Sequence, residues 1–375
     1  MNSTNSSNLN IKRYAEEGND NFQGWNSADE HLINFIKEEE IEAKNVLIIE
    51  DECGFLTLSL EADNYYCVND SYLSEEAIKS NLKLNNQSAK NVTFLSPYEP
   101  FPENIDIILL KLPKNNLYLE FLLDKINYSY KKSIPLLAAG MVKYMNTTIY
   151  NLVTSLLGGI MFSLSWKKSK IVTGYSTPST TISDFSTTLE AKDITLINMP
   201  NIFSSKKLDI GTRFFLDNYT TTPDKEINSI IDVGCANGIL ALFVNKLYSE
   251  ATLLMSDITY SAIESARKSS LKNGVTAEFN RGNALDNYPE QSADLIVCNP
   301  PFHDNHRVSI TTACNIFQQA FSVLKTDGEL TIVANKHLGY HTHLNKIFGN
   351  VEEVASDSKF TLLRCVKRSR VSFKQ

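Results

Sequence analysis

The chain of 375 residues is long enough for two domains, and 42% hydrophobic with 21% charged residues is the composition of a globular protein. Its net charge of −7 excludes a uniformly basic nucleic-acid-binding protein, so any contact with a nucleic acid must come from local basic clusters. The six cysteines stand singly, without a C-x-x-C pair. This predicts no metal site and no disulfide framework, and it favours a reducing compartment.

The first half of the chain contains stretches typical of a βαβ unit. Residues 1–21 are polar and lack an apolar signal-peptide core, which predicts a flexible tail and a cytoplasmic protein. A strand and a glycine turn are predicted in VLIIEDECGFLTLSL (46–60), a strand and a helix in 67–85, and a strand in DIILLKLPK (106–114). The apolar segment 152–166 is interrupted by two glycines and several hydroxyls. A helix end, a turn and a buried strand are expected there, not a membrane span.

The second half contains the same series in a clearer form. SIIDVGCANGILALFV (229–244) predicts a strand, a turn with the pattern Asp-x-Gly-Cys-x-x-Gly, and a helix. ATLLMSD (251–257) ends a second strand at Asp257, and the helix after it ends in Asn-Gly. TAEFNRGNAL (276–285) and the strand ADLIVCNPPF (293–302) follow. This order predicts a parallel sheet with right-handed crossovers.

The two halves match in spacing as well as in order. We pair Glu50 with Asp232, Gly54 with Gly238, Asp70 with Asp257, Asp106 with Asp294 and Lys111 with Asn299. This alignment makes the first glycine loop two residues shorter, and it is extended by the similar ends 162–170 and 360–370. We therefore predict tandem α/β domains at 22–180 and 181–375, joined by the Ser/Thr-rich stretch 175–190. The alternative is the coarse periodicity that all βαβ proteins share.

The two halves differ where chemistry is expected. The second has Asn-Pro-Pro-Phe at 299–302, whereas the first has Lys-Leu-Pro-Lys at 111–114 and no glycine at the place of Gly234. We infer one working domain and one that has lost its chemistry.

The glycine turn and Asp257 point to an adenosine-containing ligand. A tight glycine turn lets a ligand approach the backbone, and an acid about 20 residues further on suits a ribose diol. Because the turn is not G-x-G-x-x-G, a dinucleotide is less favoured. The alternative for Asp257 is a cap on the helix that follows.

The pattern Asp-x-Gly-Cys-x-x-Gly resembles the first motif of class I, Rossmann-like S-adenosylmethionine-dependent methyltransferases, with Ala236 in place of the middle glycine. The resemblance implies S-adenosylmethionine as the cofactor, with Asp232 and Gly234 near its methionine moiety and Asp257 at its ribose hydroxyls. Asn283 stands where this family places a polar side chain against the adenine amino group. It is equally well explained as a turn residue.

The stretch Asn299-Pro300-Pro301-Phe302 fits methylation of a planar amino group. The lone pair of such a nitrogen is delocalised, so the group is a poor nucleophile. The Asn299 amide oxygen and the Pro300 carbonyl can each accept one N–H, which orients the lone pair and stabilises the charge that develops on nitrogen. The prolines stiffen the loop, and Phe302 offers a stacking face. A plain strand terminator with Phe302 in the core is the alternative.

This chemistry is shared by adenine-N6, glutamine-amide and guanine-N2 methyltransferases. Four stretches resemble the bacterial ribosomal RNA guanine-N2 methyltransferases, above all the large-subunit (23S) enzymes: 22–33 (FQGWNSADEHLI), 201–215, NPPFH (299–303) and 328–367. In that family the first domain is a degenerate methyltransferase that aids stability and RNA engagement. The resemblance also places Gly211 and Thr212 near the methionine end of the cofactor. An ordinary hairpin and helix cap would explain that segment as well.

The expected catalytic residues are thus Asn299, Pro300, Pro301 and Phe302. The implied cofactor-binding residues are Gly211, Thr212, Asp232, Gly234, Cys235, Ala236, Gly238, Asp257, Ile258, Asn283 and Ala284. Candidates for RNA binding are Trp166, Lys167, Lys168, Lys170, Lys206, Lys207, Arg213, Lys367 and Arg368, although charged runs are more often solvated faces.

The expected partner is 23S rRNA, free of protein or early in assembly, with its target guanine unpaired or flipped. We expect a monomer that binds neither a membrane nor a metal. The rival functions are adenine-N6 or protein-glutamine methylation, and a non-catalytic RNA-binding assembly factor.

Overall fold

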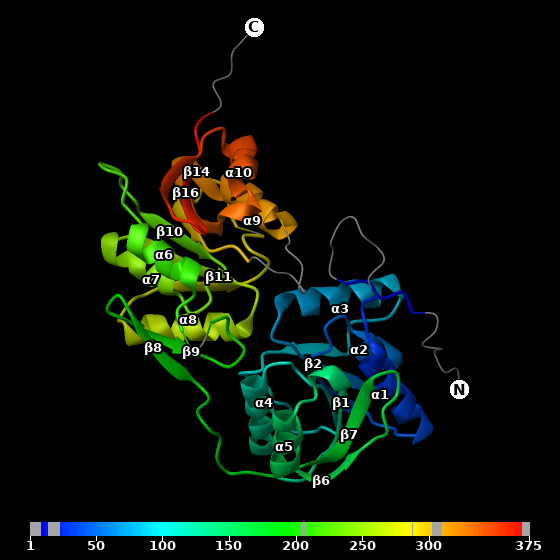
Figure 1. Cartoon of the computed structure of the whole chain (residues 1–375). Helices are drawn as coiled ribbons and strands as arrows, with labels where there is room; N and C mark the ends of the chain where they lie inside the picture. Colours follow the sequence, from blue (N-terminus) through cyan, green and yellow to red (C-terminus); the bar gives the residue numbers. More distant parts are fainter. Residues whose placement is uncertain (1–8, 14–22, 205–206, 287, 302–309, 370–375) are drawn as a thin grey trace. The chain divides into compact units, whose positions relative to one another are not determined.

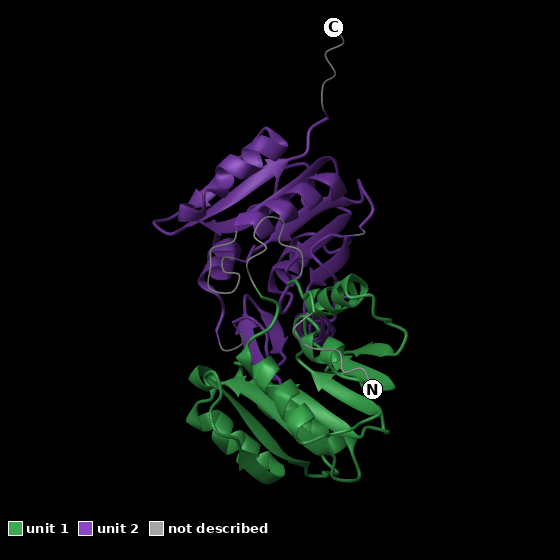
Figure 2. Cartoon of the chain, turned by 90° about the vertical axis from the view of Figure 1, so that its right-hand side faces the viewer, with its two compact units in different colours: residues 1–185 green, residues 186–375 purple. Residues whose placement is uncertain are grey.

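The computed structural model describes residues 9–13, 23–204, 207–286, 288–301 and 310–369 (Figure 1). The chain divides into two compact units, Met1–Phe185 and Ser186–Gln375 (Figure 2). Residues 177–186, within the predicted linker, form no helix or strand. Residues 9–13, which the sequence placed in a flexible tail, pack on unit 1 instead. Ile11 is buried in its core, and the amide of Lys12 donates to Asn81 Oδ1 at 3.0 Å.

Unit 1 is a seven-stranded sheet with the strand order β3-β2-β1-β4-β5-β7-β6, in which only β7 runs antiparallel. Its elements are α1 (Ser27–Glu38), β1 (Asn45–Ile49), α2 (Phe55–Ser59), β2 (Asn64–Val68), α3 (Tyr72–Leu84), β3 (Val92–Leu95), β4 (Ile107–Lys111), α4 (Asn116–Ser129), β5 (Pro135–Met141), the 3-10 helix η2 (Val142–Tyr144), α5 (Thr147–Leu156), β6 (Leu157–Phe162) and β7 (Ser169–Ser176).

Unit 2 has the equivalent order, β12-β11-β10-β13-β14-β16-β15, and only β16 is antiparallel. A hairpin of β8 (Thr187–Ala191) and β9 (Ile194–Asn198) precedes the sheet. The other elements are α6 (Ile210–Asn218), β10 (Ser229–Val233), α7 (Ile239–Leu247), β11 (Thr252–Asp257), α8 (Tyr260–Lys272), β12 (Glu278–Arg281), β13 (Ala293–Cys298), α9 (Ile310–Val323), β14 (Leu324–Asn335), the 3-10 helix η3 (Lys336–Leu338), α10 (Tyr340–Phe348), β15 (Glu352–Ser356) and β16 (Phe360–Val366).

Each sheet is buried on both faces, as a mostly parallel sheet requires. In unit 1, α1, α2 and α3 cover one face and α4 and α5 the other, and successive residues of β1 enter the two cores in turn. In unit 2, α6, α7 and α8 cover one face and α9 and α10 the other. The predicted pair of α/β domains with one shared topology is therefore confirmed.

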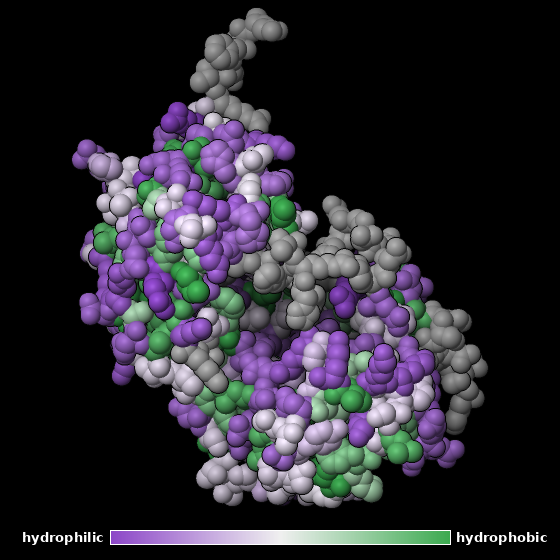
Figure 3. Space-filling view, in the orientation of Figure 1, coloured by the Kyte–Doolittle hydropathy of each residue, from purple (hydrophilic) through white to green (hydrophobic). Residues whose placement is uncertain are grey.

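The apolar segment at 152–166 differs from its prediction. The helix end is there, since α5 stops at Leu156, but the strand that follows is the exposed edge of the sheet and is not buried. Met161 is 69% exposed, and hydrophobic side chains gather on the visible surface of unit 1 where β6 runs (Figure 3). The supposed likeness of 162–170 to 360–370 is also wrong, because β16 has its counterpart in β7, which starts only at Ser169.

Strand pairing gives the true match of the two glycine loops. Asn45 pairs with the first residue of β2, as Ser229 pairs with the first residue of β11. This match gives the two loops equal lengths and aligns Glu50 (φ 64°) with Gly234 (φ 71°). The predicted pairing of Glu50 with Asp232, and the shorter first loop, were therefore wrong, because the alignment matched acid with acid and not backbone with backbone.

A second pairing was displaced by one residue. Asn69, not Asp70, is the counterpart of Asp257, because β2 and β11 pair from their first residues onward. The pairing of Lys111 with Asn299 is confirmed by the register of β4 and β13 against the central strands.

Glu50 is half-buried in unit 1, and its side chain is held by two donors. The Tyr118 hydroxyl donates to Glu50 Oε1 at 2.8 Å, and the amide of Asp70 donates to the same oxygen at 3.2 Å. Burial, followed by the nearby Asp70 carboxylate, raises the pKa of Glu50 to about 8. The folded unit thus holds a proton that the unfolded chain releases near pH 4.5.

Stability should consequently fall as the pH rises from about 5 to 8, by at most about 1.4 kcal/mol per pH unit from this group. Glu50→Gln keeps the shape and removes the titration, so its melting temperature should fall less between pH 5 and pH 8 than that of the wild type. Calorimetry at the two pH values measures this. The matched control is Glu52→Gln, at an exposed position two residues away. An equal fall in Glu50→Gln and the wild type would contradict the assignment.

Candidate active site

The glycine loop of unit 2 is fastened to the neighbouring strand by backbone hydrogen bonds. The amides of Gly234 and Cys235 both donate to the Ser256 carbonyl, at 2.8 and 3.1 Å. Gly238 (φ 83°) begins α7, and a Cβ there would lie 2.9 Å from Met255 Sδ. Ala236 adopts φ 49°, a left-handed conformation that costs a non-glycine residue about 1–2 kcal/mol.

The surface around Gly234 has room for a ligand. A Cβ built on Gly234 meets no heavy atom within 4 Å. Next to it, Asp232 Oδ2 accepts from the amide of Ala241 at 3.0 Å, while its buried Oδ1 has no partner among the described residues. Burial raises the pKa of Asp232 to about 7. An unpaired buried acceptor beside an open glycine fits a ligand that brings its own donors, such as the amino group of S-adenosylmethionine.

Asp257 joins the end of β11 to the glycine loop. Its Oδ2 accepts from the amide of Ala236 at 3.1 Å, and its Oδ1 accepts from the amide and hydroxyl of Thr259 at 3.1 and 3.2 Å. Burial raises its pKa. The alternative that Asp257 caps α8 is wrong, because the cap is Thr259, whose side chain accepts from Ala262. Ile258 lies between the two.

Asn283 and Ala284 follow β12 in a turn at the same edge of the sheet. The Asn283 carbonyl accepts from the amide of Asp286 at 3.1 Å, and the Ala284 carbonyl accepts from the Ser256 hydroxyl at 2.6 Å. The turn is therefore real, and an adenine contact of the Asn283 side chain stays a prediction.

Asn299 follows β13 directly, and its side-chain amide is held in one orientation. Nδ2 lies 3.2 Å from Asp209 Oδ2 and 3.0 Å from Thr212 Oγ1. A carboxylate can only accept, so the amide nitrogen must face Asp209. Oδ1 is then buried without a partner among the described residues. Pro300 is buried and Pro301 exposed, while Phe302 lies outside the described residues.

Asp209 caps α6, the helix that contains Gly211 and Thr212, the two residues predicted near the methionine end of the cofactor. Its Oδ2 also accepts from the amide of Thr212 at 3.0 Å. Gly211 is packed so closely that a Cβ would lie 3.1 Å from both Asp209 and Phe360. The sequence analysis missed Asp209 as a positioning residue. Its signal was an aspartate just before a helix, in the usual N-cap position.

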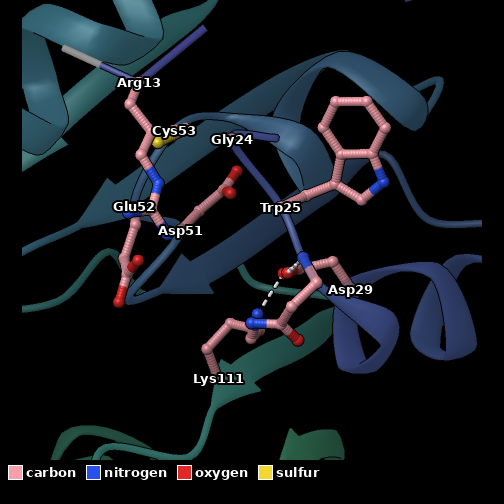
Figure 4. A pocket seen from close by; sticks show the side chains of 9 residues that line it. Arg13, Gly24, Trp25, Asp29, Asp51, Glu52, Cys53 and Lys111 are labelled. Atoms are coloured by element: carbon pink, nitrogen blue, oxygen red, sulfur yellow. Dashed lines mark hydrogen bonds and ion pairs between the residues drawn. The ribbon is translucent and has the colours of Figure 1, made fainter. Parts of the chain in front are cut away.

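The corresponding end of the sheet in unit 1 has the same backbone arrangement, but different side chains occupy the positions of Asn299, Thr212 and Gly234. Lys111 forms an ion pair with Asp29, which stands at the third position of α1 as Thr212 does in α6 (Figure 4). Glu50 fills the position that Gly234 leaves open. A small pocket of about 30 Å³ lies near Lys111. Its lining residues are Arg13, Gly24, Trp25, Asn26, Asp29, Asp51, Glu52, Cys53 and Lys111.

The basic residues predicted to bind RNA do not form one cluster within unit 2. Lys207 and Arg213 are exposed at the end of the sheet where Asn299 lies. Lys367 and Arg368 follow β16 at the opposite end. The Lys367 ammonium donates to the carbonyls of Ser322 and Leu324, at 3.1 and 2.6 Å. Lys206 lies outside the described residues, and Trp166, Lys167, Lys168 and Lys170 belong to unit 1.

Among the described residues, no group of three or more His, Cys, Asp or Glu side chains is arranged to hold a metal ion. None of the helices described is both long and apolar enough to cross a bilayer.

The strand order, the glycine loop and the acid after the second strand define a class I S-adenosylmethionine-dependent methyltransferase. The Methyltransferase small domain family matches residues 193–364, and the RLMG N-terminal domain family matches residues 1–180. Relatives at 34–35% identity over nearly the full length place the chain in the family of ribosomal RNA large subunit methyltransferase G.

Named relatives match almost end to end. The ribosomal RNA large subunit methyltransferase G of Psychromonas ingrahamii is 35% identical over 95% of this chain and 96% of its own. The same protein of Aliivibrio fischeri is 34% identical over 96% and 97%. Among solved structures, the 16S rRNA N2 methyltransferase RsmC of T. thermophilus, in complex with AdoMet and guanosine, covers 92% of this chain and 93% of its own with a TM-score of 0.77. At 18% identity this likeness shows the fold.

Gly234→Glu tests the open space at Gly234, because it introduces the residue that unit 1 has at the equivalent position, Glu50. Glu50 shows that this loop accepts a glutamate at positive φ, so the protein should fold, but the side chain should fill the space where the cofactor binds. Calorimetric titration should show one S-adenosylmethionine per wild-type chain and none for the variant.

The control is Gly274→Glu, at an exposed position of the same backbone type (φ 67°) with an equally open Cβ position beyond α8. It should bind like the wild type. Two cofactors per wild-type chain, or unimpaired binding by Gly234→Glu, would show that the space has another use.

Proposed function

We propose that this chain methylates the exocyclic N2 amino group of a specific guanine in 23S rRNA. One observation carries the proposal: Asn299 Oδ1 is buried, held in place, and without a partner among the described residues. A buried acceptor without a partner costs about 1–3 kcal/mol. A substrate amino group that donates to it removes this cost only when it is bound.

The chemistry follows from how the amino group is held. S-adenosylmethionine supplies an electrophilic methyl group on a sulfonium. Asn299 Oδ1 accepts one N–H of the target and the Pro300 carbonyl the other, so the nitrogen lone pair is oriented and the growing positive charge is stabilised. Asp209 and Thr212 keep the amide from rotating. Phe302 supplies a stacking face for the base in this proposal.

Cofactor contacts are proposed at the same edge of the sheet. The orphaned oxygen of Asp232 would receive the amino group, and Asp257 has lone pairs left for the ribose hydroxyls. Gly211 and Thr212 are proposed at the methionine end, beside Asn299. The remaining proposed contacts are Gly234, Cys235, Ala236, Gly238, Ile258, Asn283 and Ala284.

The substrate is inferred from the relatives. The curated proteins are named for the large ribosomal subunit, and the solved RsmC carries guanosine and acts on N2 of 16S rRNA. We propose a cytoplasmic monomer that acts on rRNA free of protein or early in assembly. Residues 181–375 would carry the catalysis. Residues 22–180 would engage RNA and support the fold.

Asn299→Ala tests the amide oxygen. The side chain donates to Asp209 and Thr212, and these two residues remain joined to each other by the Thr212 amide in the variant, which should therefore fold and bind S-adenosylmethionine as the wild type does. Its kcat on protein-free 23S rRNA should fall about a hundredfold. Labelled methyl transfer measures the rate, and nucleoside analysis of the digested RNA identifies the product. Unchanged turnover would exclude the role.

Two comparisons sharpen the result. Asp209→Asn keeps a good helix cap but no longer forces the amide to face one way, so kcat should drop while the melting temperature holds. Lys111→Ala, at the matching position of unit 1, should leave kcat unchanged.

The product of the wild-type enzyme separates the candidate functions. Label in N2-methylguanosine supports the proposal. Label in N6-methyladenosine or in protein glutamine supports the rival enzymes, and binding without transfer supports an assembly factor.

A further inference from the structure

Unit 1 carries an unusual hairpin turn at the end of its sheet where the parallel strands finish. Trp166 and Ser169 exchange both backbone hydrogen bonds, at 3.0 and 2.8 Å, so Lys167 and Lys168 are the two residues of the turn. Both have positive φ, 42° and 63°. Two-residue turns of this kind favour Asn-Gly, because a side chain with a Cβ is strained in the left-handed region. Two lysines here are a poor choice for folding alone.

The β8–β9 hairpin of unit 2 has a turn of the same kind. Its turn, Lys192–Asp193, also has positive φ, but its lysine forms an ion pair with Asp217 at 2.7 Å. In unit 1, Lys167 pairs with Glu30 at 3.1 Å. Lys168 makes no ion pair with any acidic side chain in the described part of the chain.

Aromatic rings and further lysines continue this surface. The amide of Val142 donates to the Lys168 carbonyl at 2.9 Å, which ties η2 to the turn. In η2 the Tyr144 ring has two ammonium groups close to it, with Lys143 4.6 Å and Lys114 4.9 Å from its centroid. A hydrogen bond from the Lys143 ammonium lowers the pKa of this partly exposed phenol. Neither lysine has an acidic partner among the described residues.

We propose that this basic–aromatic edge, made of Lys114, Lys143, Tyr144, Trp166, Lys167 and Lys168, binds a single-stranded segment of the substrate rRNA. The inference rests on the proposed function, because it takes rRNA as the substrate. Unpaired ammonium groups bind phosphates, and partly exposed rings stack on bases that are not paired. The same end of the sheet holds the glycine loop and Asn299 in unit 2. In unit 1 this end has Glu50 at the position of Gly234, and it carries these basic and aromatic side chains.

The double variant K167N/K168G separates RNA binding from folding. Asn-Gly is the preferred turn, so the melting temperature should stay the same or rise. Affinity for a fluorescent 20-nucleotide single-stranded RNA, measured by anisotropy without cofactor, should fall about tenfold. The slope of log affinity against log salt should shrink by about 0.7, because the phosphate contact of Lys168 is lost, whereas Lys167 is already paired with Glu30. On 23S rRNA the KM should rise with kcat retained.

The control K131N/K132N removes the same charge from exposed lysines before β5, at the other end of the sheet. It should change affinity less than twofold. Tyr144→Ala should weaken binding and leave the salt slope unchanged, since it removes stacking and no charge. Equal losses in the two lysine pairs, or wild-type binding by K167N/K168G, would overturn the proposal. If the wild type binds RNA through this edge and methylates none, only the proposed function fails.

Discussion

One backbone constraint governs both units: the residue after the first central strand must adopt a positive φ. Gly234 and Glu50 occupy this position at φ 71° and 64°. Glycine does so without strain and leaves the surface open, whereas glutamate accepts the strain and covers the same place with a side chain held by Tyr118 and Asp70. A single side chain thus decides whether this fold presents room for a ligand or a closed surface.

A second position, occupied by Lys111 in unit 1 and Asn299 in unit 2, also has the same backbone placement in both units but a different side chain. In both units the residue at the carboxyl end of the fourth strand of the sheet, Lys111 or Asn299, contacts the third residue of the first helix. In unit 2 this is an amide against a hydroxyl and a carboxylate, which leaves one acceptor unpaired. In unit 1 it is an ion pair that satisfies the Lys111 ammonium. The contact in unit 2 leaves an acceptor free for a substrate, whereas the ion pair in unit 1 is only structural.

The sequence was sufficient for the features that depend on local signals. The glycine turn, the Asn-Gly end of α8 and the strand before Asn299 were all predicted correctly, because each has a short-range cause in backbone preference or hydrophobic pattern. The register between the halves was not, since a glutamate at positive φ has no sequence signature. The orientation of the Asn299 amide depends on Asp209, 90 residues earlier, and no local pattern reveals such a contact.

The edge strand β6 illustrates a different limit. Its apolar residues predicted burial, yet a strand at the end of a sheet has a partner on one side only, and which strand ends the sheet is a property of topology. The order of β7 and β6 also places the turn Trp166–Ser169 beside the carboxyl end of β5. A swap of these two strands would carry the paired lysines away from Tyr144. The edge strand β6 therefore does more than complete the sheet, because it carries the chain to the end where the parallel strands finish and ligands are bound, and the antiparallel strand β7 starts from there.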